Sequence, residues 1–217
     1  MKMLSKVVEP TSRAQWRKWL ARNHASEKEI WLLSDADEPA VSYLDAVEEA
    51  LCFGWIDSVG KRLSETLRGQ RFSPRRPRSN WTEMNKARVR RLISLKLMTD
   101  AGRAVLPDLD TPFTIAPDIV SALKKTPGAL AYFEACPLLY RRIRAGYVEE
   151  QRKRAPAEFS KRLVNLVARC AEKKRFGNWD DGGRLTDRHA GILRGSSRSP
   201  SSHTENCATS RAPRSDA

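Results

Sequence analysis

The order of apolar and polar positions along the chain predicts mostly helices. The clearest helix begins at Ser42, after which apolar side chains recur three or four residues apart while Asp45, Glu48 and Glu49 face away from them. An earlier helix begins at Ser12, which is followed three residues later by a glutamine, as in a capping box. Further helices are predicted from Asn80 to residue 97 and over residues 118–125, 127–135, 137–153 and 156–174.

A shorter period, close to two, marks three candidate strands. Residues 29–33 are a brief apolar run typical of a buried strand, and residues 55–59 and 66–72 are predicted to pair as a hairpin. Two prolines in residues 73–79 exclude a regular helix or a central strand there, because proline lacks the N–H donor and fixes φ. We therefore predict an α+β fold, a helix-dominated single domain with a small antiparallel sheet, over residues 1–176.

The periodic pattern disappears after residue 176. Residues 177–217 are rich in glycine, serine and arginine, so they bury too little apolar surface to offset the entropy of ordering them. We predict a disordered tail over this range. His189, His203 and Cys207 lie within it, but their spacing fits no zinc site. No metal and no cofactor is predicted.

Composition restricts the class of protein. The 217 residues are 40% hydrophobic, which suffices for a packed core, and no run approaches the ~18 apolar residues of a membrane helix. The first ten residues lack the apolar region and the cleavage site of a secretory signal. A cytoplasmic protein without an integral membrane segment is therefore expected. Four widely spaced cysteines argue against a disulfide scaffold.

The net charge of +14 is unevenly distributed. Residues 27–57 contain nine acids and one base, a net charge of −8, whereas residues 61–91 contain eleven bases and two acids, a net charge of +9. Such asymmetry can steer an external partner or match neighbouring elements of the fold to each other. We favour the second interpretation, in which the acidic helix is held against the arginine-rich loop of residues 73–79.

Four motifs occur in order along the chain: ALCFGWIDS at residues 50–58, FSPRRPRSNW at 72–81, LMTDAG at 97–102 and LYRRIRAGYVEEQRK at 139–153. Together they resemble the YdeI/OmpD-associated family, also described as bacteriocin-protection proteins, over residues 10–177. The resemblance implies a bacterial protein linked to outer-membrane porins and to tolerance of antimicrobial peptides, with no agreed catalytic mechanism. Lys96 stands where the family usually has a glycine, which leaves open how the preceding helix ends.

The residues with the greatest chemical potential surround the proline-braced loop. Arginine side chains there can bind a carboxylate or phosphate bidentately, and tryptophans can supply a stacking wall. The alternative is structural: Asp57 pairs with a loop arginine and fixes it, with the tryptophans in the core. This alternative weighs more, because buried charges are normally paired for structural reasons. The candidate ligand-binding residues are Trp55, Asp57, Arg75, Arg76, Ser79, Asn80 and Trp81.

Other classes of function stay open. In residues 61–91 many arginines are interleaved with Phe72 and Trp81, as in a groove for nucleic acid, although no nucleic-acid motif occurs and only weak polyanion binding is expected. An enzyme has no positive support, because Cys52 lies in an apolar run and no nucleotide or nucleophile motif is present. The basic helix of residues 137–153 is interpreted as a solvated face and not as a membrane anchor. We expect a protein that binds a small anion or a protein partner.

Overall fold

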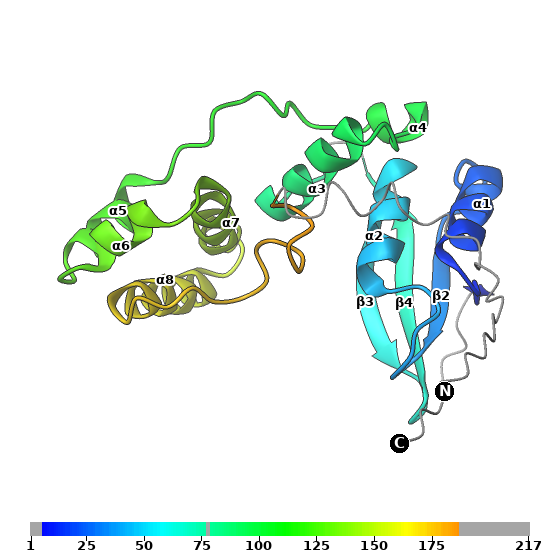
Figure 1. The fold of residues 1–217 in the computed structure, drawn as a ribbon, viewed down its shortest axis with the longest axis horizontal. Coiled ribbons are helices and arrows are strands. Elements are labelled where there is room, and N and C mark those ends of the chain that lie inside the picture. The colour runs from blue at the N-terminus through cyan, green and yellow to red at the C-terminus, as the bar shows by residue number, and fades with distance from the viewer. Residues whose placement is uncertain (1–5, 77–78, 187–217) are drawn as a thin grey trace, which may run out of the picture.

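A computed structural model describes residues 6–76 and 79–186, and it confirms an α+β fold in which helices dominate (Figure 1). The strands are β1 (Val7–Val8), β2 (Ile30–Asp35), β3 (Trp55–Arg62) and β4 (Leu67–Pro74). The helices of the same half are α1 (Arg13–Asn23), α2 (Tyr43–Cys52), α3 (Glu83–Ser94) and α4 (Asp100–Arg103). The second half contains α5 (Pro117–Lys124), α6 (Ala129–Ala135), α7 (Leu138–Glu149) and α8 (Pro156–Ala171).

The sheet has the strand order β1-β2-β4-β3. β3 and β4 form the predicted antiparallel hairpin, and β2 pairs antiparallel with β4, so that Ile30 lies opposite Phe72. β1 runs parallel to β2, with Val7 opposite Trp31. The three predicted strands thus pair antiparallel, and β1, a strand that the sequence did not predict, makes the sheet mixed at this edge. A strand of two residues is too short to show an alternating pattern in the sequence.

The helix starts follow local capping chemistry. Ser12 and Ser42 cap α1 and α2 as predicted, and each hydroxyl accepts a hydrogen bond from the backbone N–H three residues later. The predicted start of α3 at Asn80 is wrong. Thr82 is the cap instead, and its Oγ1 accepts a hydrogen bond of 3.1 Å from the backbone N–H of Asn85. The backbone of Thr82 has the extended conformation that a cap requires.

The reversal at the end of α3 is formed by Lys96 and not by a glycine. Lys96 adopts the left-handed conformation, with φ of +59°. The backbone N–H of Lys96 donates to the carbonyl of Ile93 at 2.9 Å, and that of Leu97 donates to the carbonyl of Leu92 at 3.0 Å. The helix therefore ends in the reversal that glycine favours, although the residue at the reversal carries a side chain.

The apolar side chains gather in two clusters. The first lies between the sheet and helices α1 to α3, around Trp16, Trp55 and Phe72. The second lies among α5 to α8, around Phe133 and Tyr140. Residues 104–116, which contain two of the prolines, run between the two parts as an extended connector, and α3 packs against α7 (Figure 1). Among the described residues, no helix is long and apolar enough to span a membrane.

After α8 the chain returns towards α3 and α2. We call residues 177–186 the return segment (orange at its end in Figure 1). The side chain of Asp181 is buried there, and its carboxylate accepts hydrogen bonds of 2.7 and 3.0 Å from Arg88. These contacts differ from the disorder predicted for residues 177–217, because the ion pair of Asp181 and the packing of Trp179 against the second apolar cluster hold the segment. The rest of that range, with His189, His203 and Cys207, lies outside the described residues.

Candidate anion-binding site

Arg75 is placed by the end of the β3–β4 hairpin. Its backbone N–H donates to the carbonyl of Gly54 at 2.9 Å, next to the register pair Trp55 and Pro74. Gly54 has φ of +75°, and a Cβ at this position would meet the carbonyl of Ala101 at 3.0 Å. The close approach of these backbones fixes the start of the loop and directs the Arg75 side chain inward, where only 7% of the residue is exposed.

The Arg75 guanidinium stacks on the ring of Trp81. Its central carbon lies 3.5 Å from the ring centroid, which is a face-on cation–π contact. One terminal nitrogen donates to the Ser79 hydroxyl at 3.4 Å and to the Asn80 carbonyl at 3.3 Å, both long for hydrogen bonds. Stacking therefore sets the orientation of the guanidinium, while its hydrogen bonds to protein are weak.

The charge of Arg75 is not compensated. Among the described residues, no carboxylate lies within ion-pair distance of it, and its Nε is buried without a hydrogen-bond partner. Burial lowers the pKa of Arg75 to about 10, and the attraction of Asp57 opposes that shift only in part. The group stays protonated at neutral pH. It is a desolvated cation whose hydrogen-bonding capacity is largely unused.

A recess of about 320 Å³ opens beside this cation. One wall carries Arg75, Arg76, Ser79 and Trp81 from the predicted set, with Arg76 exposed. The other wall comes from the start of the connector and is mostly apolar; it consists of Ala104, Val105, Leu106 and Pro107. A cation facing an apolar wall suits a small anion that has an apolar part.

Three of the predicted site residues do not line the recess: Trp55, Asp57 and Asn80, whose backbone carbonyl accepts the hydrogen bond from Arg75. Trp55 is buried in the first core, and its Nε1 donates to the carbonyl of His24 at 3.1 Å. The Asp57 carboxylate accepts a hydrogen bond of 2.7 Å from the Tyr43 hydroxyl. Burial, with the neighbouring Asp57 charge, raises the pKa of Tyr43. Among the described residues, Asp57 therefore forms no ion pair with an arginine of the loop, contrary to what the structural alternative predicted.

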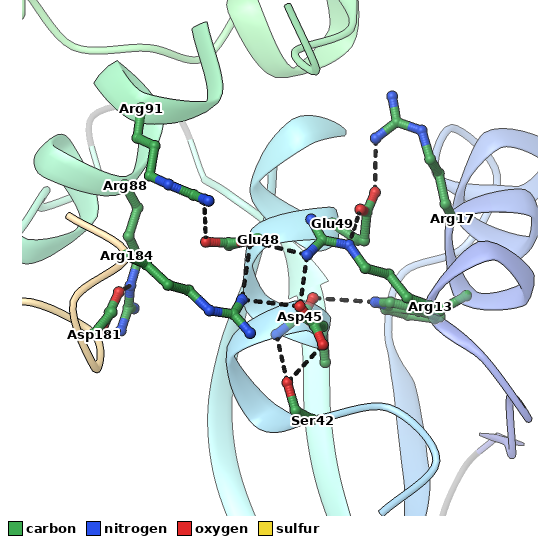
Figure 2. A network of polar contacts seen from close by, with 12 residues as sticks. Arg13, Arg17, Ser42, Asp45, Glu48, Glu49, Arg88, Arg91, Asp181 and Arg184 are labelled. Atoms are coloured by element: carbon green, nitrogen blue, oxygen red, sulfur yellow. Dashed lines mark hydrogen bonds and ion pairs between the residues drawn. The ribbon is translucent and has the colours of Figure 1, made fainter. Parts of the chain in front are cut away.

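The acidic side of α2 forms a network that the sequence did not reveal (Figure 2). The sequence pattern predicts that Asp45, Glu48 and Glu49 face away from the protein. This prediction is wrong, because the side chains of Glu48 and Glu49 are buried. Arg13 of α1 approaches all three carboxylates, at 2.5, 3.1 and 2.6 Å respectively. Arg17, also from α1, pairs with Glu49 at 2.7 Å.

Two further arginines complete this α2 network from more distant segments. Arg91 of α3 pairs with Glu48 at 2.7 Å, and Arg184 of the return segment pairs with Asp45 at 2.8 Å and with Glu48 at 3.2 Å. Figure 2 shows Arg91 and Arg184 approaching α2 from one side, whereas the two arginines of α1 approach from the other. The acidic helix is thus matched internally, but by α1, α3 and the return segment and not by the loop of residues 73–79.

Cys52 is fully buried, and burial raises the pKa of its thiol to about 11, which keeps it protonated. No group of three or more histidine, cysteine or acidic side chains in the described part of the chain is arranged to hold a metal ion.

Two family matches divide the chain at the connector. Residues 8–105 match a domain described as "Domain of unknown function (DUF8412)". Residues 112–173 match the family described as "Bacteriocin-protection, YdeI or OmpD-Associated". No curated protein and no solved structure matches the chain. The predicted resemblance to the YdeI/OmpD-associated family is therefore confirmed over residues 112–173, but not over the whole of residues 10–177, because residues 8–105 match the other domain.

Proposed function

We propose that this protein binds a small organic anion in the recess beside Arg75. The observation that carries the proposal is a buried guanidinium that stacks on Trp81 and has no carboxylate partner among the described residues. A buried charge without a counter-charge costs several kcal/mol, so an anion that enters the recess offsets a penalty already present in the fold. The planar guanidinium is also suited to two parallel hydrogen bonds with a carboxylate or phosphate.

The lining of the recess narrows the ligand class. Val105, Leu106 and Pro107 offer an apolar surface opposite the charged wall, and the exposed Arg76 adds positive charge at the edge. A carboxylate with a compact apolar body satisfies both walls at once. A fully hydrated inorganic ion engages only the arginine side, so we expect it to bind more weakly.

The ion pairs formed by basic residues of the segment 61–91 support a small ligand rather than nucleic acid. Many of them are paired within the protein: Arg71 with Glu29, Lys86 with Glu83, Arg88 with Asp181 and Arg91 with Glu48. A guanidinium paired in this way contributes less to a phosphate-tracking surface. Bacteriocin protection, named in the description of the matched family, is extended to this chain as a proposal, with anion binding as its biochemical basis.

The test is isothermal titration calorimetry of the whole chain with benzoate, acetate and inorganic phosphate. We expect benzoate to bind most tightly, and we expect Arg75→Gln to weaken it at least about tenfold, since charge-assisted hydrogen bonds contribute about 1.5–3 kcal/mol. Arg22→Gln is the matched control, because it removes one exposed arginine at the end of α1.

A second variant separates loss of binding from loss of folding. Ala104 is exposed and lines the recess, so Ala104→Trp fills the space without disturbing the core. We expect this variant to unfold like the wild type and to lose benzoate binding. Equal binding by the wild type, Arg75→Gln and Ala104→Trp would show that the recess is not the site.

A further inference from the structure

A second and larger recess, of about 430 Å³, lies where the two parts of the protein meet. It is bounded by α3, α7 and the end of the return segment, and it shares no lining residue with the recess beside Arg75. We call it the α3–α7 recess. Four arginines line it, Arg90, Arg91, Arg142 and Arg184, against one carboxylate, that of Glu83. Guanidiniums therefore outnumber carboxylates in the lining, although Arg91, Arg142 and Arg184 also form ion pairs with acids of the protein.

These arginines are held in place but keep unused donors. Arg90 donates to the carbonyl of Leu109, Arg91 to Glu48, and Arg184 to Asp45 and Glu48, in each case through one nitrogen. Arg142 binds Glu83 through two nitrogens, at 3.0 and 2.9 Å. A guanidinium has five N–H donors, so each of the four retains donors for an oxygen-rich anion.

Apart from Ser94, the rest of the lining is apolar. Leucines contribute from three elements: Leu95 from the end of α3, Leu138 and Leu139 from the start of α7, and Leu185 from the return segment. Leu138 is 62% exposed, so its apolar surface is open to a ligand in the recess. An inorganic anion engages none of this surface, whereas an alkyl chain covers it.

The return segment builds one wall of this recess. Asp181 is 1% exposed and is anchored by the two hydrogen bonds from Arg88. The backbone N–H of Leu185 donates to the carbonyl of Asp180 at 3.0 Å, which closes a turn in which Gly182 and Gly183 both have positive φ. This turn sets Arg184 and Leu185, a cation and an apolar side chain, next to each other at the recess.

We propose that the α3–α7 recess binds an anionic amphiphile, that is, an alkyl chain with a carboxylate or phosphate head group. The head group lies among the guanidiniums of Arg91, Arg142 and Arg184, which supply charge-assisted hydrogen bonds. The chain lies along the leucines, where burial of its methylene groups favours binding. This proposal is independent of the site at Arg75, because the two recesses have different walls and different ligand classes.

The test is calorimetric titration of the whole chain with monomeric decyl phosphate, and separately with decanol and with inorganic phosphate. Decyl phosphate has both the head group and the chain, whereas each comparison compound has only one of them. We expect decyl phosphate to bind at least about tenfold more tightly than either, a difference of about 1.4 kcal/mol. Equal binding of decanol and decyl phosphate would overturn the proposal, because the arginines would then have no role.

Two variants locate the binding without requiring loss of a buried residue. Leu138→Asp puts a negative charge on the exposed edge of the recess, at the first turn of α7, where an acid is compatible with the helix. Ala87→Trp fills the recess from α3. Both are expected to weaken decyl phosphate at least about tenfold. Val164→Asp is the matched control, because Val164 is also an exposed apolar residue but lies on α8.

Membrane lipids also combine an anionic head group with alkyl chains, and a vesicle assay distinguishes binding to a membrane surface from binding of a monomeric amphiphile. Sedimentation with phosphatidylglycerol vesicles measures binding to a surface, which cannot enter a recess of this size. We expect little vesicle binding at the ionic strength at which decyl phosphate binds. Vesicle binding without binding of monomeric decyl phosphate, or wild-type affinity in both recess variants, would overturn the proposal.

Discussion

Replacing Lys96 by glycine is expected to stabilise the protein. Lys96 has φ of +59°, a conformation that costs an ordinary residue about 1–2 kcal/mol. Its side chain is exposed, and among the described residues it makes no hydrogen bond or ion pair that the substitution would remove. Glycine relieves the strain but has a more flexible unfolded chain, which costs about 0.4–1 kcal/mol. The difference predicts a gain of about 0.5–1 kcal/mol in the free energy of unfolding for Lys96→Gly.

The assay is urea unfolding followed by circular dichroism, with the midpoint compared at an unchanged dependence on denaturant. Lys18→Gly is the matched control, because Lys18 is exposed in the interior of α1. It loses the same charge and gains the same flexibility, but its backbone is helical, so it should lose about 1 kcal/mol. Lys96→Ala keeps the strained backbone and should stay close to the wild type. Destabilisation of Lys96→Gly by as much as Lys18→Gly would refute the explanation.

The α2 network supports two further predictions. Glu48 is 1% exposed and faces three guanidiniums. Glu48→Gln should therefore lower the free energy of unfolding, measured by urea titration, by about 3 kcal/mol. The control, Glu172→Gln at an exposed position, should change it by less than about 0.5 kcal/mol. For Asp45, burial acts to raise the pKa, but hydrogen bonds from Ser42 and Arg184 and the charge of Arg13 hold the pKa below its ordinary value. This stabilisation is present above about pH 4 and is lost as the pH falls further. Between about pH 5 and pH 3, the range in which carboxylates titrate, Asp45→Asn should therefore lose less stability than the wild type. Urea unfolding at each pH measures the difference.

Local patterns predicted the elements well, because the physics that forms them is local. Ser42 caps α2 three residues before Asp45, and the apolar positions that follow repeat with the helical period. The same periodicity misplaced the acids of α2, since it assigns charged residues to solvent. Glu48 is buried by Arg13, 35 positions earlier, and by Arg184, 136 positions later. No spacing rule connects residues so far apart.

The candidate site was predictable only in its contiguous part. Arg75, Ser79 and Trp81 lie within one proline-containing loop, so the loop brings them together directly. The apolar wall at residues 104–107 comes from a different segment and carries no motif of its own. Asp57 was placed wrongly because proximity along a hairpin does not decide which partner a carboxylate takes. A tyrosine from α2, Tyr43, reaches it instead.

The distribution of charge connects the two proposals. In the α2 network four guanidiniums, those of Arg13, Arg17, Arg91 and Arg184, share three carboxylates, so the described part of this cluster keeps one excess positive charge. Two of these arginines also line the α3–α7 recess, where the excess faces an open space. The guanidinium of Arg75 is a second excess positive charge, and it is buried without a carboxylate partner among the described residues. A chain with a net charge of +14 cannot neutralise every basic residue with its own acids, and two of the excess charges, that of Arg75 and that of the α2 network, lie at recesses that an external anion can fill.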